Sequence, residues 1–156
     1  MNKSFLAAAL AVGLIVADNA AANTVSAADP ENLHNFLFTH GVQARLSKDD
    51  FGDPTIRVHH EDTKFSIYFY GCDAGQRCDS IGFYAGYRTD GAWTLDHANA
   101  WNSERRFAKS YVSDKGTARL ELEVFTGDFG LAPADFGKIY TNWTNSIVAF
   151  EDAIGW

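Results

Sequence analysis

Two cysteines, Cys72 and Cys78, are the residues of this chain whose type and spacing most clearly suggest chemistry, and the sequence has no others. They lie at the facing ends of two stretches that alternate apolar and polar residues within FSIYFYGCDAGQRCDSIGFYAGY, residues 65 to 87. A redox-active pair would favour C-x-x-C spacing at a helix N-terminus, and a zinc site needs more ligands than two cysteines. We therefore expect a structural disulfide that joins the ends of a hairpin.

Other residues that could bind metal or catalyse a reaction lack a recognisable pattern. The five histidines show no ligand spacing, Asp49, Asp50 and Asp53 do not match a calcium loop, and there is no G-x-S-x-G motif. Glu121 and Glu123 would share a strand face and could act as acid and base, but the flanking Arg119 favours a solvated outer face. We expect no catalytic residues, no metal and no cofactor. An envelope hydrolase is the least favoured alternative.

A second group of polar residues occurs in NAWNSERRF, residues 99 to 107. On a helix Asn99, Asn102 and Arg106 would share one face, next to a face with Trp101 and Arg105. These side chains could grip a carboxylate or a peptide backbone, which makes Trp101, Asn102 and Arg106 candidate binding residues. The alternative is that they bond to the ends of neighbouring strands and fix the helix against the sheet.

The N-terminus has the layout of a secretory signal peptide. Lys3 precedes an apolar run from Phe5 to Ala17 and a small-residue tract, so cleavage is expected after Ala22, or alternatively after Ala27. The run is shorter than the roughly 20 residues that span a bilayer. The sequence thus predicts a signal at residues 1–22, a flexible leader at 23–28, and a periplasmic or secreted location in which a disulfide is stable.

Composition limits the partners. The chain has 156 residues and a formal net charge of −7, and its only adjacent basic pair is Arg105 and Arg106. An acidic chain of this kind is a poor phosphate binder, so we expect no nucleic acid partner. No later segment is apolar for long enough to cross a membrane. Residues 29–156 are of a length that suits one domain.

The periodicities predict an α+β fold in two layers, with a mostly antiparallel sheet and the helices on one face. Asp29 and Pro30 begin a helix that Gly41 ends, Thr94 caps a helix that runs to about Arg106, and Pro133 opens a third with an apolar stripe. Alternating residues predict strands near 42–47, 55–59, 65–70, 81–87, 111–112 and 118–124. The order is helix, four strands, helix, two strands, helix. Short loops between consecutive strands favour antiparallel pairing.

The sheet face opposite the helices is then predicted to be polar and aromatic. It would carry three tyrosines, Tyr68, Tyr70 and Tyr84, together with Arg57, His59, Ser66, Arg119, Glu121 and Glu123. Such an amphipathic patch suits contact with another protein, so the tyrosines are candidate binding residues. The alternative is that loops or the helix around Trp101 cover them.

The stretch FSIYFYGC with its second cysteine, and NAWNSERRF leading into SYVSDKGTARLELEV, resemble the YbjN domain family, whose members are described as bacterial sensory transduction regulators. The resemblance spans about residues 29 to 152. It implies an α+β fold similar to the small chaperones of type III secretion, which bind polypeptides and often pair into dimers, and it implies no catalytic residue. A homodimer is therefore one option for this chain.

Together these features predict an exported, non-enzymatic binding or regulatory module that contacts another protein in the cell envelope. The alternative is a binder of a small ligand or envelope fragment, held in a cleft between the helix around Trp101 and the sheet.

Overall fold

The computed structural model describes residues 24–127 and 129–156, so the predicted signal at residues 1–22 lies outside the described part. The predicted order of elements is confirmed. The helices are α1 (Pro30–Thr39), α2 (Leu95–Glu104) and α3 (Pro133–Ile154). The strands are β1 (Gln43–Lys48), β2 (Pro54–His60), β3 (Thr63–Tyr70), β4 (Ser80–Arg88), β5 (Lys109–Val112) and β6 (Thr117–Phe125).

The helices begin where their capping residues predict. The Asp29 side chain accepts a hydrogen bond from the Asn32 backbone N–H at the start of α1, and Thr94 accepts one from the His97 N–H at the start of α2. The α3 helix begins at Pro133 and ends at Gly155, whose φ of 69° is the left-handed conformation that glycine adopts most easily.

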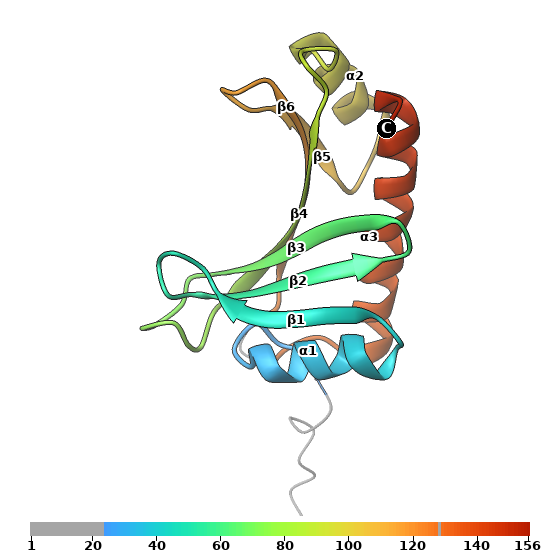
Figure 1. The fold of residues 1–156 in the computed structure, drawn as a ribbon. Helices are drawn as coiled ribbons and strands as arrows, with labels where there is room; N and C mark the ends of the chain where they lie inside the picture. The colour runs from blue at the N-terminus through green and yellow to red at the C-terminus, as the bar shows by residue number, and fades with distance from the viewer. Residues whose placement is uncertain (1–23, 128) are drawn as a thin grey trace, which may run out of the picture.

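The six strands form one antiparallel sheet in the order β1-β2-β3-β4-β6-β5. β4 pairs with β3 from Ser80 to Tyr84, and with β6 along its whole length to Arg88. The start of β3 therefore leaves β4, and β1 to β3 splay away from β4 to β6 (Figure 1). The sheet is strongly bent at this point.

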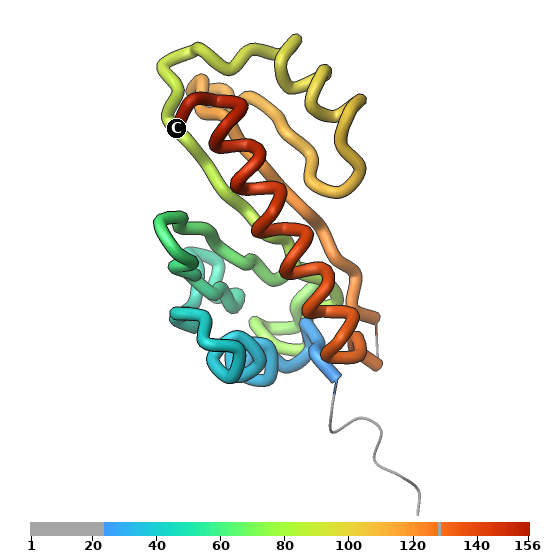
Figure 2. Tube along the Cα trace, turned by 90° about the vertical axis from the view of Figure 1, so that its right-hand side faces the viewer, coloured from blue at the N-terminus to red at the C-terminus, as the bar shows by residue number. Residues whose placement is uncertain are grey.

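The core lies between the sheet and α3, which crosses the sheet diagonally (Figure 2). Trp143 of α3 is fully buried against Phe65 and Phe83, at ring-centroid distances of 5.7 and 5.5 Å. α1 packs beside the N-terminal half of α3 and α2 beside its C-terminal end, through Phe36 on Phe136 and Trp101 on Phe150. α3 thus covers one face of the sheet, while α1 lies along its β1 edge and α2 along its β5 edge (Figure 1).

A carboxylate on α3 ties the two splayed strands together. The Thr63 hydroxyl of β3 donates to Oε1 of Glu151 at 2.8 Å, and the Tyr87 hydroxyl of β4 donates to the same oxygen at 2.9 Å. Burial and this carboxylate raise the pKa of Tyr87. Both strands are thereby fixed to α3 where they separate.

The expectation of a flexible leader is wrong for residues 24–28. Val25 forms an isolated antiparallel bridge with Leu131, with N–H to carbonyl distances of 2.8 and 2.9 Å, and its side chain is 2% exposed. Ala27 is also buried, and its N–H donates to the Thr126 hydroxyl. The sequence suggested a leader because these residues are small or polar. In the structure they fit a tight site beside the segment that precedes α3, where Gly130 lies against Thr24 and Val25. Within the described residues, no helix is long and apolar enough to cross a membrane.

Candidate functional site

No described helix covers the sheet face opposite α3 (Figure 1). Each of its six strands has at least one exposed side chain there, although Thr55 and Gly82 are buried. The strand register places its residues in rows, because directly paired residues point to the same side. One row crosses the whole sheet and consists of Arg45, Arg57, Ser66, Tyr84, Glu121 and Lys109. We call this side the open face.

The three candidate tyrosines lie together on the open face. The rings of Tyr68 and Tyr84 meet edge to face with centroids 5.9 Å apart. The Tyr70 ring lies over Gly82, where a Cβ would come within 2.9 Å of it, and the side chain remains 50% exposed. Partial burial and the nearby Glu121 raise the pKa of Tyr70. No described helix covers these rings.

The open face holds two further aromatic residues that the sequence analysis did not select. Phe125 pairs with Ser80, whose other partner is Tyr70, and it is 72% exposed. The Tyr111 hydroxyl on β5 donates a hydrogen bond to Glu121 at 2.6 Å. Burial, and to a smaller extent this bond, raise the pKa of Tyr111. The alternation Arg119, Glu121, Glu123 continues to Phe125, so the same period-two pattern could have found it.

Glu121 and Glu123, considered as an acid–base pair, lie on the open face among basic and aromatic groups. Glu121 accepts from Tyr111 and stands opposite Lys109 on β5. The guanidinium of Arg119 lies over the Tyr84 ring, 4.9 Å from its centroid. This arrangement fits a solvated outer face, with Arg119 and Tyr84 in cation–π contact.

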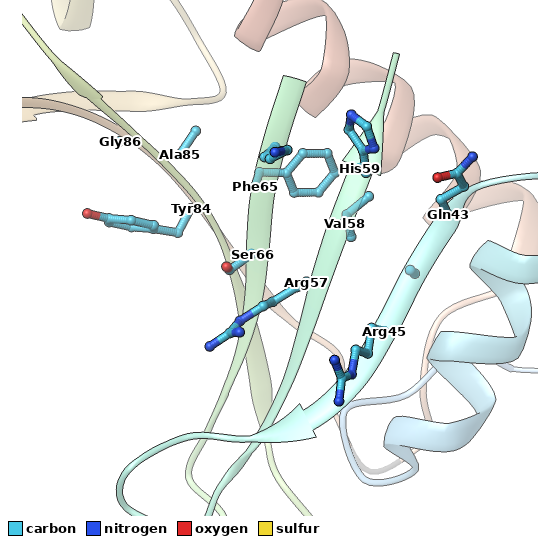
Figure 3. A pocket seen from close by; sticks show the side chains of 12 residues that line it. Gln43, Arg45, Arg57, Val58, His59, Phe65, Ser66, Tyr84, Ala85 and Gly86 are labelled. Atoms are coloured by element: carbon cyan, nitrogen blue, oxygen red, sulfur yellow. The ribbon is translucent and has the colours of Figure 1, made fainter. Parts of the chain in front are cut away.

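A shallow pocket of about 460 Å³ opens where β3 leaves β4, next to the tyrosines (Figure 3). In the figure Arg57, Ser66 and Tyr84 project from neighbouring strands toward the same side. The polar side chains that line the pocket are those of Gln43, Arg45, Arg57, His59, Lys64, Ser66 and Tyr84, and none of its lining residues is acidic. The open face therefore joins an aromatic area to a basic one.

Cys72 and Cys78 form a disulfide, as predicted. It closes the loop between β3 and β4. Within this loop the Asp73 backbone forms an isolated β-bridge with Gln76, and the Asp73 side chain forms an ion pair with Arg77. Gly75 of this loop lies against the turn between β1 and β2, because a Cβ there would come within 2.7 Å of the Gly52 carbonyl oxygen. The disulfide thus fixes one end of the open face.

Trp101 and Asn102 are committed to contacts within the chain. Asn102 donates from Nδ2 to the Ser110 carbonyl oxygen at 2.9 Å and accepts at Oδ1 from the Ser110 N–H at 2.7 Å. The Trp101 indole N–H donates to the Ala108 carbonyl oxygen at 3.0 Å. These bonds hold α2 to β5, which matches the structural alternative and leaves neither polar group free to grip a ligand.

The prediction that Arg106 shares a helical face with Asn99 and Asn102 is wrong. α2 ends at Glu104, and Arg105 has the extended conformation, with φ −115° and ψ 145°. The chain leaves the helix there because the bonds from Trp101 and Asn102 draw residues 108–110 back alongside α2. The Arg106 guanidinium instead lies 5.6 Å from the Phe107 ring centroid.

Within the part of the chain that the structure describes, no group of three or more His, Cys, Asp or Glu side chains is arranged to hold a metal ion. The histidines are dispersed. His34 donates from Nε2 to the Ala44 carbonyl oxygen at 3.2 Å, His60 packs on Tyr140, and His97 completes the cap of α2.

Comparison with known proteins identifies the family. A model of the YbjN family, described as "Putative bacterial sensory transduction regulator", matches residues 29–156. No curated protein matches the chain. The matched range contains the entire sheet and all three helices. The chain therefore belongs to the YbjN family.

Proposed function

We propose that this protein is a non-enzymatic regulatory module of the bacterial cell envelope that binds another protein through its open face. The observation that supports this most directly is the group of aromatic side chains, Tyr68, Tyr70, Tyr84 and Phe125, on a sheet face that no described helix covers. Tyrosine and phenylalanine are enriched in protein interfaces, and monomers rarely leave such groups in water.

Binding through the face is favoured over addition of a strand at the outer edges, because helix side chains bond backbone groups of both outer strands. Asn102 satisfies the outward N–H and carbonyl of Ser110 on the edge strand β5. On the other edge His34 bonds the Ala44 carbonyl of β1, and α1 lies alongside. A partner strand would have to displace these side chains before it could pair.

The small-ligand alternative is less favoured. It requires a cleft between α2 and the sheet in which Asn102 and Arg106 converge. Asn102 is bonded to Ser110 through both of its polar atoms, and Arg106 lies beyond the end of the helix.

Site-specific photo-crosslinking in living bacteria tests the proposal. A benzoylphenylalanine at position 125 on the open face should form a discrete crosslink to one partner protein. The double substitution Tyr70→Ala and Tyr84→Ala should lower the yield at least fivefold, which corresponds to a loss of about 1 kcal/mol of binding free energy; truncating an aromatic hot spot removes about 2 kcal/mol or more.

Two exposed apolar residues on helices provide the control. Phe38 on α1 and Val148 on α3 belong to helices and not to the open face, so Phe38→Ala with Val148→Ala should leave the yield unchanged. A crosslink at position 125 that is insensitive to the tyrosine substitutions, or crosslinking only from position 38, would show that the partner binds elsewhere.

A further inference from the structure

The open face carries the opposite charge to the chain as a whole. Among the six strands, two acidic side chains, Glu121 and Glu123, point to this face, against six basic ones: Arg45, Arg57, Lys64, Arg88, Lys109 and Arg119. The face therefore has a formal excess of four positive charges, while the whole chain has a net charge of −7.

These charges are segregated along the sheet. Both glutamates lie on β6, where Lys109 stands opposite Glu121 and the Tyr111 hydroxyl donates to it. On β1 to β3 the basic side chains of the pocket have no carboxylate among the lining residues. Both ion pairs within the described residues, Arg77–Asp73 and Lys138–Asp135, lie elsewhere.

The basic half is arranged unfavourably for the isolated protein. Arg45 and Arg57 are direct cross-strand partners on this face. Like charges directly opposite one another destabilise a sheet. Since nothing described in the chain neutralises Arg45 and Arg57, an anionic group from outside would remove a repulsion as well as form new bonds.

The spacing of the charges indicates an extended anionic partner. Neighbouring strands are about 4.8 Å apart, so the basic residues of β1, β2 and β3 cover roughly 10 Å. Carboxylates on alternate residues of a polypeptide lie about 7 Å apart, so successive carboxylates can each meet a basic side chain on a different strand, and one chain can pair with all three. The pocket also adjoins Tyr84, which belongs to the aromatic group.

We propose that the basic half of the open face binds an acidic polypeptide segment of the partner, with its carboxylates on Arg45, Arg57 and Lys64. This inference rests on the proposed function and specifies the chemistry of the partner. Arginine suits the role because its planar guanidinium pairs with carboxylates in a bidentate manner.

Titration of the ¹⁵N-labelled domain, residues 24–156, with synthetic peptides tests the inference. A ten-residue peptide of alternating glutamate and serine should shift backbone amide signals of β1, β2 and β3, and binding should weaken as salt rises from 50 to 300 mM. A matched lysine–serine peptide should cause no shifts there.

The double substitution Arg45→Gln and Arg57→Gln should weaken binding of the acidic peptide by about fivefold, as expected for two solvent-accessible charge pairs. Lys115→Gln with Lys138→Gln makes the same change in net charge away from the open face and should have no effect. Unchanged circular dichroism spectra establish that each variant is folded.

Any of four results would overturn the inference. The Arg45/Arg57 variant could bind the peptide as well as the unaltered protein, or the shifts could be confined to other elements. A ten-nucleotide oligothymidine could bind more tightly at the same residues, or sedimentation could show a dimer that the Arg45/Arg57 substitutions dissociate. The proposed function has a separate test. If crosslinking at position 125 depends on the tyrosines while the acidic peptide fails to bind, the face is an interface whose partner lacks this chemistry.

Discussion

At the scale of single residues, the most consequential side chain is one that the sequence suggested for a different role. The Asn102 side-chain amide pairs with Ser110 as a neighbouring strand would, because it donates to the outward carbonyl oxygen and accepts from the outward N–H. The types and spacing of the polar residues predicted a functional face around Asn102, but not whether it served a ligand or the chain itself. That distinction depends on where β5 returns, which is set by tertiary contacts.

Asn102→Ala should lower the free energy of unfolding by about 2–3 kcal/mol, because it leaves two backbone groups of the buried Ser110 without partners. Asn102→Asp keeps the acceptor and should lose less. Urea unfolding measures the difference, and the neighbouring exposed Ser103→Ala should shift it by less than about 0.5 kcal/mol. A loss from Asn102→Ala no larger than this control would show that the edge contacts are weak.

Tyr140 predicts how stability depends on pH. Burial raises its pKa to about 12, above the value of about 10 in an unfolded chain. The contribution of Tyr140 to stability is therefore complete below pH 10 and is lost as pH rises toward 12, since the unfolded state releases its proton first. Urea unfolding between pH 9 and 11.5 should show this decline, and a shallower one for Tyr140→Phe. Identical slopes would contradict the assignment.

At the scale of elements, the strands and their faces could be predicted because each follows a period of two and one face is buried throughout. The boundaries of α2 could not, since its last turn is decided by bonds from Trp101 and Asn102 to residues 108–110. The local sequence favours a helix that continues to Arg106, but tertiary hydrogen bonds end the helix at Glu104.

The disulfide should stabilise the β3–β4 hairpin mainly by restricting the unfolded chain. For so short a loop the chain-entropy model gives about 2 kcal/mol, so Cys72→Ala with Cys78→Ala should lower the free energy of unfolding by that amount. Adding a reductant to the unaltered protein should reproduce the loss and should not affect the double variant. Stability that is unchanged by both treatments would assign the bond no structural role.

At the scale of the whole molecule, the fold class followed from the order of periodic segments, whereas the docking of residues 24–28 did not. Val25 and Ala27 lie in a stretch of small and polar residues that gives no periodic signal, and their site exists only once Leu131 and Thr126 are in place. The same applies to the basic pocket, because Arg45, Arg57 and Lys64 come together only through the strand register.

The docked segment predicts where an exported chain would be cleaved. Cleavage after Ala22 retains Val25 and Ala27, whereas cleavage after Ala27 removes them and should lower the free energy of unfolding by about 3 kcal/mol, chiefly through the lost burial of Val25. We expect mass spectrometry of the mature protein to place its first residue at Asn23. Thermal unfolding of chains that begin at Asn23 and Ala28 measures the difference, and equal stability would contradict the role of the segment.

Thr63 and Tyr87 both donate hydrogen bonds to Glu151 on the helix side of the sheet, next to the point where the pocket opens on the open face. The pocket opens where β3 and β4 separate, and at this point both strands are bonded to one carboxylate of α3. Under the proposed function, a partner would meet strands that are already bonded to α3, and less conformational entropy would then be lost on association. The arrangement of the strands on the open face is thus tied to contacts on the helix side of the sheet.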